Sequence, residues 1–511
     1  MNKKLLFMSV ALGFTHFLCA QTPQLLKVRK HFEDNQHAII NEFTSFLSIP
    51  NIASDSPNIR KNADFIMTAL NRRGVQNVQL LFPTSTKAVP AVYGEVMTPG
   101  ATQTIIFYAH YDGQPVIPSQ WAKGLAPFTP VLTNESLEKG GSIINFPSAG
   151  TPYDLQNRIY ARSASDDKAG VMAIINAYDA LMKTGLKPTV NIKFFFEGEE
   201  EAGSDHLHEI FQNYTALLKS DLWIICDGPV HQSGLKQVVF GVRGDAHVDI
   251  TVYGSKRPLH SGHYGNWAPS PPMMLAKLLA TMKDDHGKVT IKDFYSDVVP
   301  LSEAEKKALA AVPPVDIQMK KELGFAEPEI KTMSLGEALT LPSLNINGIQ
   351  SGGVGKNASN VITTSASCVL DLRLVVGNEY QKQQQKVVDH IKAQGYYVID
   401  REPTDEERSK YPKIAKVTLS GGYNAQKTPM DLPIAKKVIT AVKSTTTEQV
   451  VLIPNAGGSL PLFVFEKYLN AKTITVPIAN HDNNQHAENE NIRLLNFRNG
   501  IETFAALMMM K

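Results

Sequence analysis

Short apolar runs that end next to acidic residues or histidines limit the possible folds of this chain most strongly. The main runs precede the polar motifs as follows: TIIFYA before His110, VNIKFFF before Glu200, LWIIC before Asp227 and KTITVPIA before His486. They are rich in β-branched and aromatic residues and are followed by glycine or polar residues, which is typical of buried strands in a parallel sheet. Because open α/β sheets bind ligands at the carboxyl ends of their strands, we expect these polar side chains to converge in space.

Length and composition indicate a globular protein with a large core. The chain has 511 residues, of which 43% are hydrophobic and 20% are charged. A chain of this size is expected to form more than one domain. Its formal net charge of +2 gives no indication of binding to nucleic acids or other polyanions.

The first 20 residues have the pattern of a secretory signal peptide. Lys3 and Lys4 precede an apolar stretch from Leu5 to Leu18, and the small residue Ala20 stands before Gln21. We therefore expect residues 1–20 to be removed and the mature chain to be exported from a bacterial cytoplasm, either to the periplasm or to the medium. A membrane anchor is the alternative, but the stretch is shorter than the ~20 residues that a spanning helix needs.

The cysteines suggest no disulfide framework. Lipid attachment at Cys19 stays open as an alternative, although Leu18 is a poor residue before a lipidated cysteine. Cys226 and Cys368 lie within apolar, strand-like runs, so we interpret both as buried structural thiols.

The hydrophobic periodicity changes twice along the chain. Residues 21–241 alternate strands with helices such as KAGVMAIINAYDALMKTG, in which one apolar stripe runs from Val171 to Met182 and Gly185 ends the helix. Residues 242–423 contain AHVDITVYG and SCVLDLRLVV, which alternate apolar and polar residues as half-buried strands do. Two helices, SPPMMLAKLLATM and EYQKQQQKVVDHIKAQG, follow such strands.

Residues 424–511 return to the first pattern. We therefore predict an α/β domain formed by 21–241 and 424–511, with a mostly parallel central sheet. It is interrupted by an α+β domain with the order strand-helix-strand-strand-helix-strand and an antiparallel sheet. The polar segment from Lys283 to about Leu341 is interpreted as an elaboration of this insert.

The polar motifs favour a site for two divalent metal ions. Carboxylates and imidazoles without thiolates suit zinc, with manganese or cobalt possible. Two ions need a bridging ligand, and Asp166 lies between two histidine and carboxylate pairs in sequence order. His110 and Asp112 are two residues apart at a strand end and point to the same face, so Asp112 could hold the ring of His110.

Glu200 and Glu201 are adjacent, which allows one to bind metal while the other stays free as a base. Two metal ions can hold a hydroxide, and a free glutamate can take its proton and later deliver it to a leaving amine. Glu197 and Glu199 are interpreted as residues that support such a site from outside or face solvent.

The full succession of motifs resembles a known enzyme family. AHYDG, SASDDKAG, EGEEEAGS, IICDG, LHSGHYG, NASNVITTSASCVLDLRLV, AGGSLP and QHAEN are similar, in this order, to motifs of the dinuclear zinc metallopeptidases that include carnosinase, cytosolic non-specific dipeptidase, aminoacylase and succinyl-diaminopimelate desuccinylase. The resemblance covers nearly the whole mature chain. It implies a zinc-binding α/β domain interrupted by a ferredoxin-like lid through which many members form homodimers.

The resemblance also implies the roles of single residues. It makes His110 and Asp227 ligands of one metal, Glu201 and His486 ligands of the other, and Asp166 the bridge, joined to Asp167 by a cis peptide bond. It gives Glu200 the role of general base and Asp112 the role of the family's helper residue in the histidine motif. It also makes His260 the lid residue that reaches the substrate carbonyl. In dimeric members this histidine comes from the opposite subunit. The positions that hold the substrate carboxylate are Asn360, Arg373 and Ser459.

Some features depart from the family pattern or leave the substrate open. Ala161, Arg162 and Ser163 stand where the family usually has GRG, and the segment from Asn134 to Arg158 is longer than in compact dipeptidases. Asp227, where other branches have glutamate, favours hydrolysis of dipeptides or short peptides. The alternatives are an N-acyl amino acid amidohydrolase of the aminoacylase or desuccinylase type, and a metal- or peptide-binding protein without catalysis.

Overall fold

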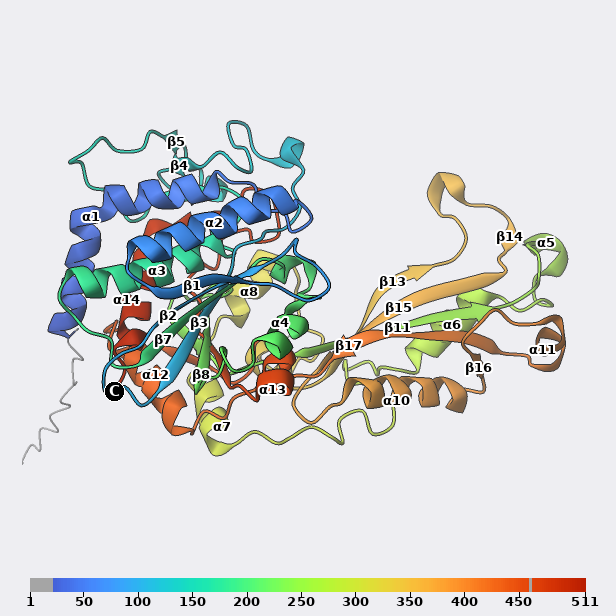
Figure 1. Ribbon diagram of the computed structural model, residues 1–511. Helices are drawn as coiled ribbons and strands as arrows, with labels where there is room; N and C mark the ends of the chain where they lie inside the picture. The colour runs from blue at the N-terminus through green and yellow to red at the C-terminus, as the bar shows by residue number, and fades with distance from the viewer. Residues whose placement is uncertain (1–21, 459–461) are drawn as a thin grey trace, which may run out of the picture.

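The computed structural model describes residues 22–458 and 462–511, and these form two units built on different sheets (Figure 1). The expected signal segment 1–20, with Cys19, and the candidate residue Ser459 lie outside the described residues. Within the described residues, no helix combines the length and the apolar character needed to cross a membrane.

The larger unit contains an eight-stranded sheet in the order β1-β2-β7-β3-β8-β20-β9-β19. Neighbours among the central strands β7, β3, β8 and β20 are parallel, whereas the β1–β2, β2–β7 and β20–β9 pairs are antiparallel. The α/β class is therefore confirmed, with a sheet that is more mixed than predicted. The strands are β1 (Gln76–Leu81), β2 (Ala91–Val96), β3 (Thr104–His110), β7 (Asn191–Glu197), β8 (Leu222–Ile225), β9 (Gln237–Val239), β19 (Val451–Ile453) and β20 (Thr473–Thr475).

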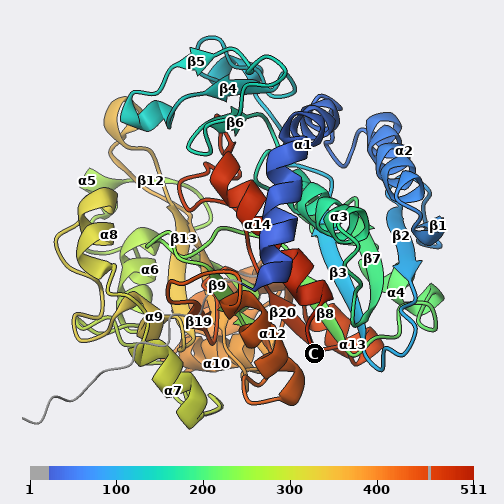
Figure 2. The same ribbon diagram turned by 90° about the vertical axis from the view of Figure 1, so that its left-hand side faces the viewer.

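Helices cover both faces of this sheet because its strands carry apolar side chains on both sides. Phe107 and Tyr108 of β3 are successive residues, and they belong to different core clusters. The first cluster includes α1 (Pro23–Leu47), α2 (Ser56–Arg72), α3 (Lys168–Lys183), α12 (Pro433–Lys443) and α14 (Leu494–Met508) (Figure 2). The second includes α4 (Leu207–Asn213) and α13 (Phe463–Leu469).

The buried residues of α3 differ from the apolar stripe that its sequence pattern predicted. Met182, the last residue of the expected apolar stripe, is 48% exposed, whereas Lys168 and Asn176 are buried. The reason is that α3 packs against both α1 and α14, which come from the two ends of the described chain. Its N-terminus is thereby fixed at the centre of the unit.

A small four-stranded sheet joins the long segment 134–158 to the last part of the chain. Its order is β21-β6-β4-β5, and β6 pairs with β21 through Ile159 and Ile492. This pairing places the His486 segment next to the residues that precede Asp166. The strands are β4 (Val131–Thr133), β5 (Ile143–Ile144), β6 (Arg158–Tyr160) and β21 (Asn491–Arg493).

The second unit is inserted between β10 (Gly241–Val242) and β18 (Gln426–Lys427), which pair with each other. Its sheet has the order β13-β15-β11-β17-β16, and α6 (Pro271–Ala280) and α10 (Tyr380–Ala393) pack against it. Without β16, this is the strand order of a ferredoxin-like unit. The strands are β11 (Gly244–Tyr253), β13 (Ser343–Gln350), β15 (Ser365–Leu374), β16 (Tyr397–Ile399) and β17 (Ile414–Tyr423).

The segment between α6 and β13, interpreted as an elaboration of the insert, also contacts the larger unit. It contains α7 (Glu303–Ala310), α8 (Asp316–Leu323) and α9 (Leu335–Ala338). Helix α7 packs against β19 of the larger unit, and Glu305 pairs with Lys427 at 2.5 Å. Asn455 of the larger unit donates its side-chain amide to the Leu339 carbonyl at 3.0 Å.

Candidate metal centre

The carboxyl ends of neighbouring parallel strands bring the first group of predicted ligands together. His110 is the last residue of β3, and Asp227 follows two residues after β8. Glu200 and Glu201 begin a short 3-10 helix just after β7, the other neighbour of β3. The convergence expected from the apolar runs is thus present at one edge of the sheet.

Asp166 stands between the two sides of the centre. Its Oδ1 lies 3.0 Å from Nε2 of His110, and its Oδ2 lies 3.2 Å from Nε2 of His486. The peptide bond from Asp166 to Asp167 is cis, and the Asp167 side chain caps α3. Two groups of potential ligand atoms share Asp166, with each group's atoms within 4.8 Å of one another: His110, Asp166 and Asp227, and Asp166, Glu201 and His486.

Glu200 lies beside these groups without belonging to either. Its Oε2 is 3.9 Å from Nε2 of His110, and its side chain is 14% exposed. In contrast, Oε2 of its neighbour Glu201 lies 3.2 Å from Nε2 of His486. The adjacent glutamates therefore occupy different positions, one within a ligand group and one next to it.

Asp112 links the histidine side of the centre to the two glutamates. Its Oδ1 lies 3.4 Å from Nδ1 of His110. Its two carboxylate oxygens also accept the backbone N–H groups of Glu200 and Glu201, each at 3.0 Å. One buried carboxylate thus orients the imidazole and fixes the backbone that carries the free glutamate.

Glu490 is a supporting residue that sequence reasoning missed. It is fully buried, and it accepts the backbone N–H groups of Ser163, Ser165 and Asp166 at 2.8 to 2.9 Å. Arg162 donates to the same carboxylate at 2.8 Å. The sequence signal was a departure near the aspartate motif, where Ala161 and Ser163 replace the two glycines of the family's GRG, together with a glutamate four residues after His486.

Of the two interpretations of Glu197, support of the site from outside and a solvent-facing position, the structure agrees with the first. Glu197 is 3% exposed and accepts a hydrogen bond from the Tyr108 hydroxyl at 2.6 Å. Burial raises its pKa to about 7. Glu199, in contrast, accepts a hydrogen bond from His206 at the edge of the site, so neither glutamate joins the two ligand groups.

The electrostatics of the centre favour bound cations. Burial, and then the charge of Asp166, raise the pKa of Glu201 to about 8 and that of Asp227 to about 6. Burial also raises the pKa of Glu200 well above its usual value, and the neighbouring acids add to this. Carboxylates held this close need positive charge to stay ionised together, and divalent ions supply it.

The donor atoms fit metals that accept nitrogen and oxygen. The nearest thiol, Cys226, is fully buried, and burial raises its pKa well above the usual range. It therefore offers no thiolate ligand. Two histidines and three carboxylates, with one carboxylate shared, suit a pair of zinc, manganese or cobalt ions.

A third acidic group in the inserted unit has a different character. Asp245, His247 and Asp371 lie on the neighbouring strands β11 and β15, but the guanidinium of Arg373 lies among them, with its Nε 3.1 Å from Asp371 and 3.7 Å from Asp245. The arginine supplies the positive charge there. This group is an ion-pair cluster in which Arg373 is held by two acids.

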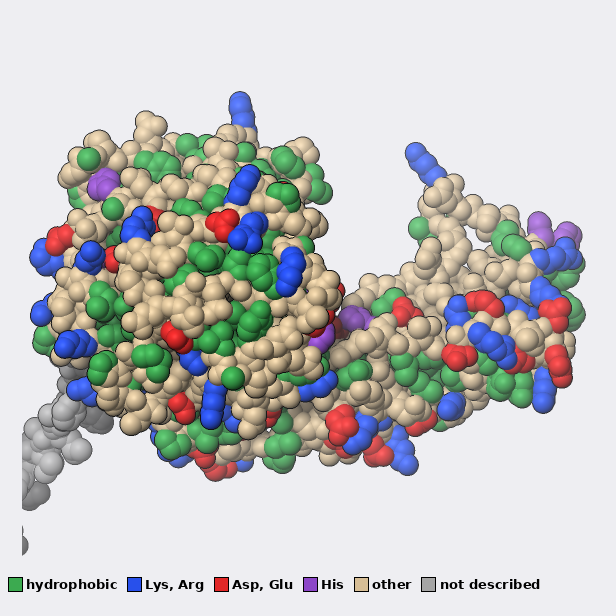
Figure 3. Space-filling model, in the orientation of Figure 1, with side chains coloured by type: hydrophobic (Ala, Val, Ile, Leu, Met, Phe, Trp, Pro, Cys, Tyr) green, Lys and Arg blue, Asp and Glu red, His purple; other side chains and the backbone are tan. Residues whose placement is uncertain are grey.

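His260 and Asn360 lie together, but they do not join the metal centre of their own chain. β12 (Leu259–His260) pairs with β14 (Val361–Ile362), and the Asn360 carbonyl accepts the Ser261 N–H at 2.9 Å. Both segments lie at the end of the inserted unit that is remote from the large sheet (Figure 1). Exposed histidine side chains are visible at this end (Figure 3).

Comparison with known families identifies the kind of protein. Residues 106–510 match Peptidase family M20/M25/M40, which spans all five predicted ligands. The chain belongs to this family. As an M20 protein it is a metallopeptidase, an enzyme that hydrolyses peptide bonds. M20 peptidases are dinuclear metal enzymes, and the two ligand groups that share Asp166 provide for two ions.

Individual M20 relatives are similar over both units of the chain. The Cys-Gly metallodipeptidase of Candida albicans is 26% identical, over 93% of this chain and 95% of its own length. The β-Ala-His dipeptidase of Homo sapiens is 24% identical, over 82% of this chain and 77% of its own. The crystal structure of an M20 family metallo-carboxypeptidase from Sulfolobus solfataricus superposes with a TM-score of 0.72 at 27% identity, over 92% of this chain and 98% of its own.

Proposed function

We propose that this M20 peptidase is a dipeptidase that hydrolyses dipeptides or short peptides with two bound zinc ions. The single observation that carries the proposal is the arrangement around Asp166, where two ligand groups share one carboxylate and Glu200 remains beside them. Similarity to enzymes described as Cys-Gly and β-Ala-His dipeptidases supports the substrate class. A protein that only bound metal would have no need of Glu200.

The proposed chemistry depends on Glu200 as general base. Two divalent ions at this site would activate a water molecule and polarise the scissile carbonyl. Glu200 takes a proton from the attacking water and delivers it to the leaving amine. Asp112 keeps Glu200 in place through its backbone N–H and orients His110.

We further propose that the active enzyme is a homodimer in which the inserted unit acts as a lid. His260 lies in β12, which precedes α5 and pairs with β14, and α5 and β14 lie at the end of the inserted unit remote from the large sheet (Figure 1). A second copy can supply His260 together with Asn360. The edge strand β13 is exposed from Asn345 onward and includes Ile346 and Ile349, which are 44% and 62% exposed. Such an apolar strand edge favours pairing with another copy. Arg373 and Ser459 then hold the substrate carboxylate.

A substrate panel tests the proposed activity. The purified mature protein is assayed with zinc or manganese against Ala-Ala, β-Ala-His and N-acetyl amino acids. The proposal expects the dipeptides to be hydrolysed with the higher kcat/KM. Faster hydrolysis of N-acetyl amino acids would instead identify an N-acyl amino acid amidohydrolase, and no hydrolysis with both metals bound would identify a binding protein.

We also propose that the chain is exported after removal of its first residues. The charged, apolar and small residues of the segment 1–20 support this. Expression in a bacterial host followed by fractionation and N-terminal sequencing tests it. An exported chain that begins near Gln21 is expected, whereas a cytoplasmic chain that keeps residues 1–20 contradicts the proposal.

A further inference from the structure

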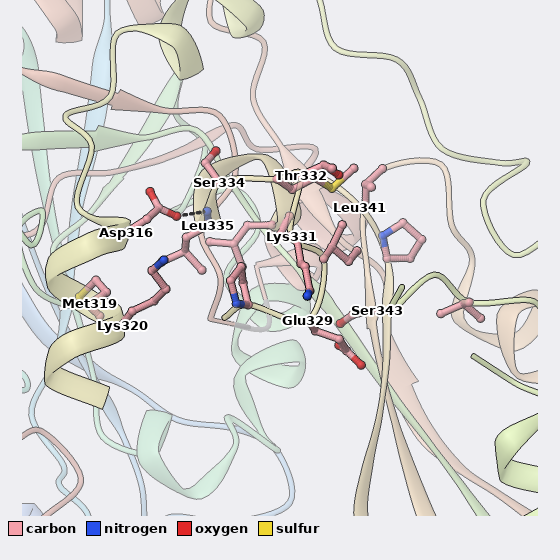
Figure 4. A pocket seen from close by; sticks show the side chains of 18 of the residues that line it. Asp316, Met319, Lys320, Glu329, Lys331, Thr332, Ser334, Leu335, Leu341 and Ser343 are labelled. Carbon is pink, nitrogen blue, oxygen red and sulfur yellow. Dashed lines mark hydrogen bonds between the residues drawn. The ribbon is translucent and has the colours of Figure 1, made fainter. Parts of the chain in front are cut away.

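A pocket separate from the metal centre lies where the Lys283–Leu341 segment joins the two units. Its volume is about 520 Å³, and it is lined by α8, by the stretch from Pro328 to Leu335, and by Arg243 and Ser343. Figure 4 shows side chains of α8 and of this stretch around the pocket. None of the predicted metal ligands lines it. Its size lies in the range of small-molecule binding sites, roughly 300–1,000 Å³.

The walls of the pocket are mainly apolar. They come from α8, from the stretch that follows it and from the region just after α6. Such walls favour a ligand with an apolar body. The main apolar residues are Val289, Met319, Leu323, Phe325, Ile330 and Leu335.

Arg243 gives the pocket a buried positive charge without a matching acid. It is 6% exposed, and its Nη2 donates only to neutral groups, the Leu341 carbonyl at 3.0 Å and the Ser343 hydroxyl at 2.7 Å. In the described part of the chain, its guanidinium forms no ion pair within 4.0 Å, and its Nε has no hydrogen-bond partner. Burial and the neighbouring Arg373 lower the pKa of Arg243 to about 10, which Asp371 offsets only in part.

A second cation adds to this charge. Lys320 of α8 forms no ion pair within 4.0 Å in the described residues, whereas Lys283 pairs with Glu329 and Lys331 with Glu327. Lys320 and Lys331 extend into the pocket region from different sides (Figure 4). The acid on α8, Asp316, accepts the backbone N–H of Leu335 at 2.8 Å. The pocket is lined by four cationic side chains and two acidic ones, so its charge is positive on balance.

We propose that this pocket binds a small organic anion, a carboxylate with an apolar body. Its carboxylate forms the missing ion pair with Arg243, Lys320 strengthens the positive potential, and the apolar body packs against α8. A charged hydrogen bond to a guanidinium is among the strongest polar contacts available. None of the predicted metal ligands takes part in this site, and the proposal does not depend on the identity of the peptide substrate.

Calorimetric titration of the full mature protein, with its metals bound, tests the proposal. The probes are 1-naphthaleneacetate and its neutral counterpart 1-naphthaleneacetamide. We expect saturable binding of the carboxylate at one site and at least about tenfold weaker binding of the amide, the scale of one lost charged contact. Absence of carboxylate binding, or equal binding of the amide, overturns the proposal.

Matched variants locate the bound probe. Lys320→Glu should weaken carboxylate binding by about tenfold or more, whereas Lys321→Glu makes the same charge change on α8 outside the pocket and should leave it unchanged. Ala338→Trp fills the pocket and should abolish binding. Binding that survives both Lys320→Glu and Ala338→Trp belongs to another site, such as the metal centre, and contradicts the proposal.

Discussion

The carboxylate of Asp112 accepts the backbone N–H of Glu200 at 3.0 Å, from a position where it also lies 3.4 Å from the imidazole of His110. One side chain therefore couples a predicted metal ligand to the predicted base. A change at Asp112 should disturb metal binding and catalysis together.

Asp112→Asn tests this coupling. Asparagine keeps the size of the side chain, but its amide group cannot accept the second backbone N–H, from Glu201. Loss of such a supporting contact should lower metal affinity or turnover by about 10–100-fold. Metal titration and steady-state kinetics measure the two effects, and a variant normal in both would show that Asp112 does not support the centre.

The shared position of Asp166 predicts different metal contents for different variants. Asp166→Ala should lose both ions, because the two ligand groups have only this residue in common. His110→Ala and His486→Ala should each weaken mainly one site. Metal analysis of the purified proteins after dialysis distinguishes these outcomes. Full occupancy by two ions in Asp166→Ala would show that Asp166 does not bridge the two ions.

Glu490 predicts an effect on the stability of the protein. Glu490→Gln leaves Arg162 without its buried partner, which should destabilise the protein by about 3–5 kcal/mol. Urea unfolding measures the change in the free energy of unfolding. Glu488→Gln, two residues earlier at an exposed position, should stay within about 0.5 kcal/mol of the parent. Equal effects of the two variants would contradict the role assigned to Glu490.

Mixed dimers test whether His260 acts across subunits. His260→Ala should lose turnover while both metals stay bound, since one donor to the developing charge contributes ~3 kcal/mol. Mixing His260→Ala with Glu200→Gln chains creates one site with both residues intact. Activity should return in mixed dimers isolated with two different tags. If verified mixed dimers stay inactive, His260 does not serve a partner's site.

The strands and the motif residues were predictable because their signals are local. The runs that form β3, β7 and β8 combine buried side chains with a polar end. In contrast, the burial of α3 depends on α1 and α14, whose partners lie far away in sequence. No local pattern could show that Met182 faces solvent.

The burial of two acids near the site was harder to predict from the sequence. Glu197 and Glu490 lie in polar surroundings in the sequence, where a glutamate usually faces solvent. Their burial follows from donors brought in by distant segments, the Tyr108 hydroxyl for Glu197 and the Arg162 loop for Glu490. The path of the Lys283–Leu341 segment was also not predictable, because its contact with β19 joins residues more than a hundred positions apart.

The role of Glu200 is the central claim, and kinetics combined with metal analysis of Glu200→Gln tests it most directly. Glutamine nearly matches glutamate in shape but cannot accept a proton from water. The account predicts two bound ions, unchanged substrate affinity and turnover reduced by about 100-fold or more. Near-normal turnover with both ions bound would contradict it and would transfer the role of base to Glu199 or Glu201.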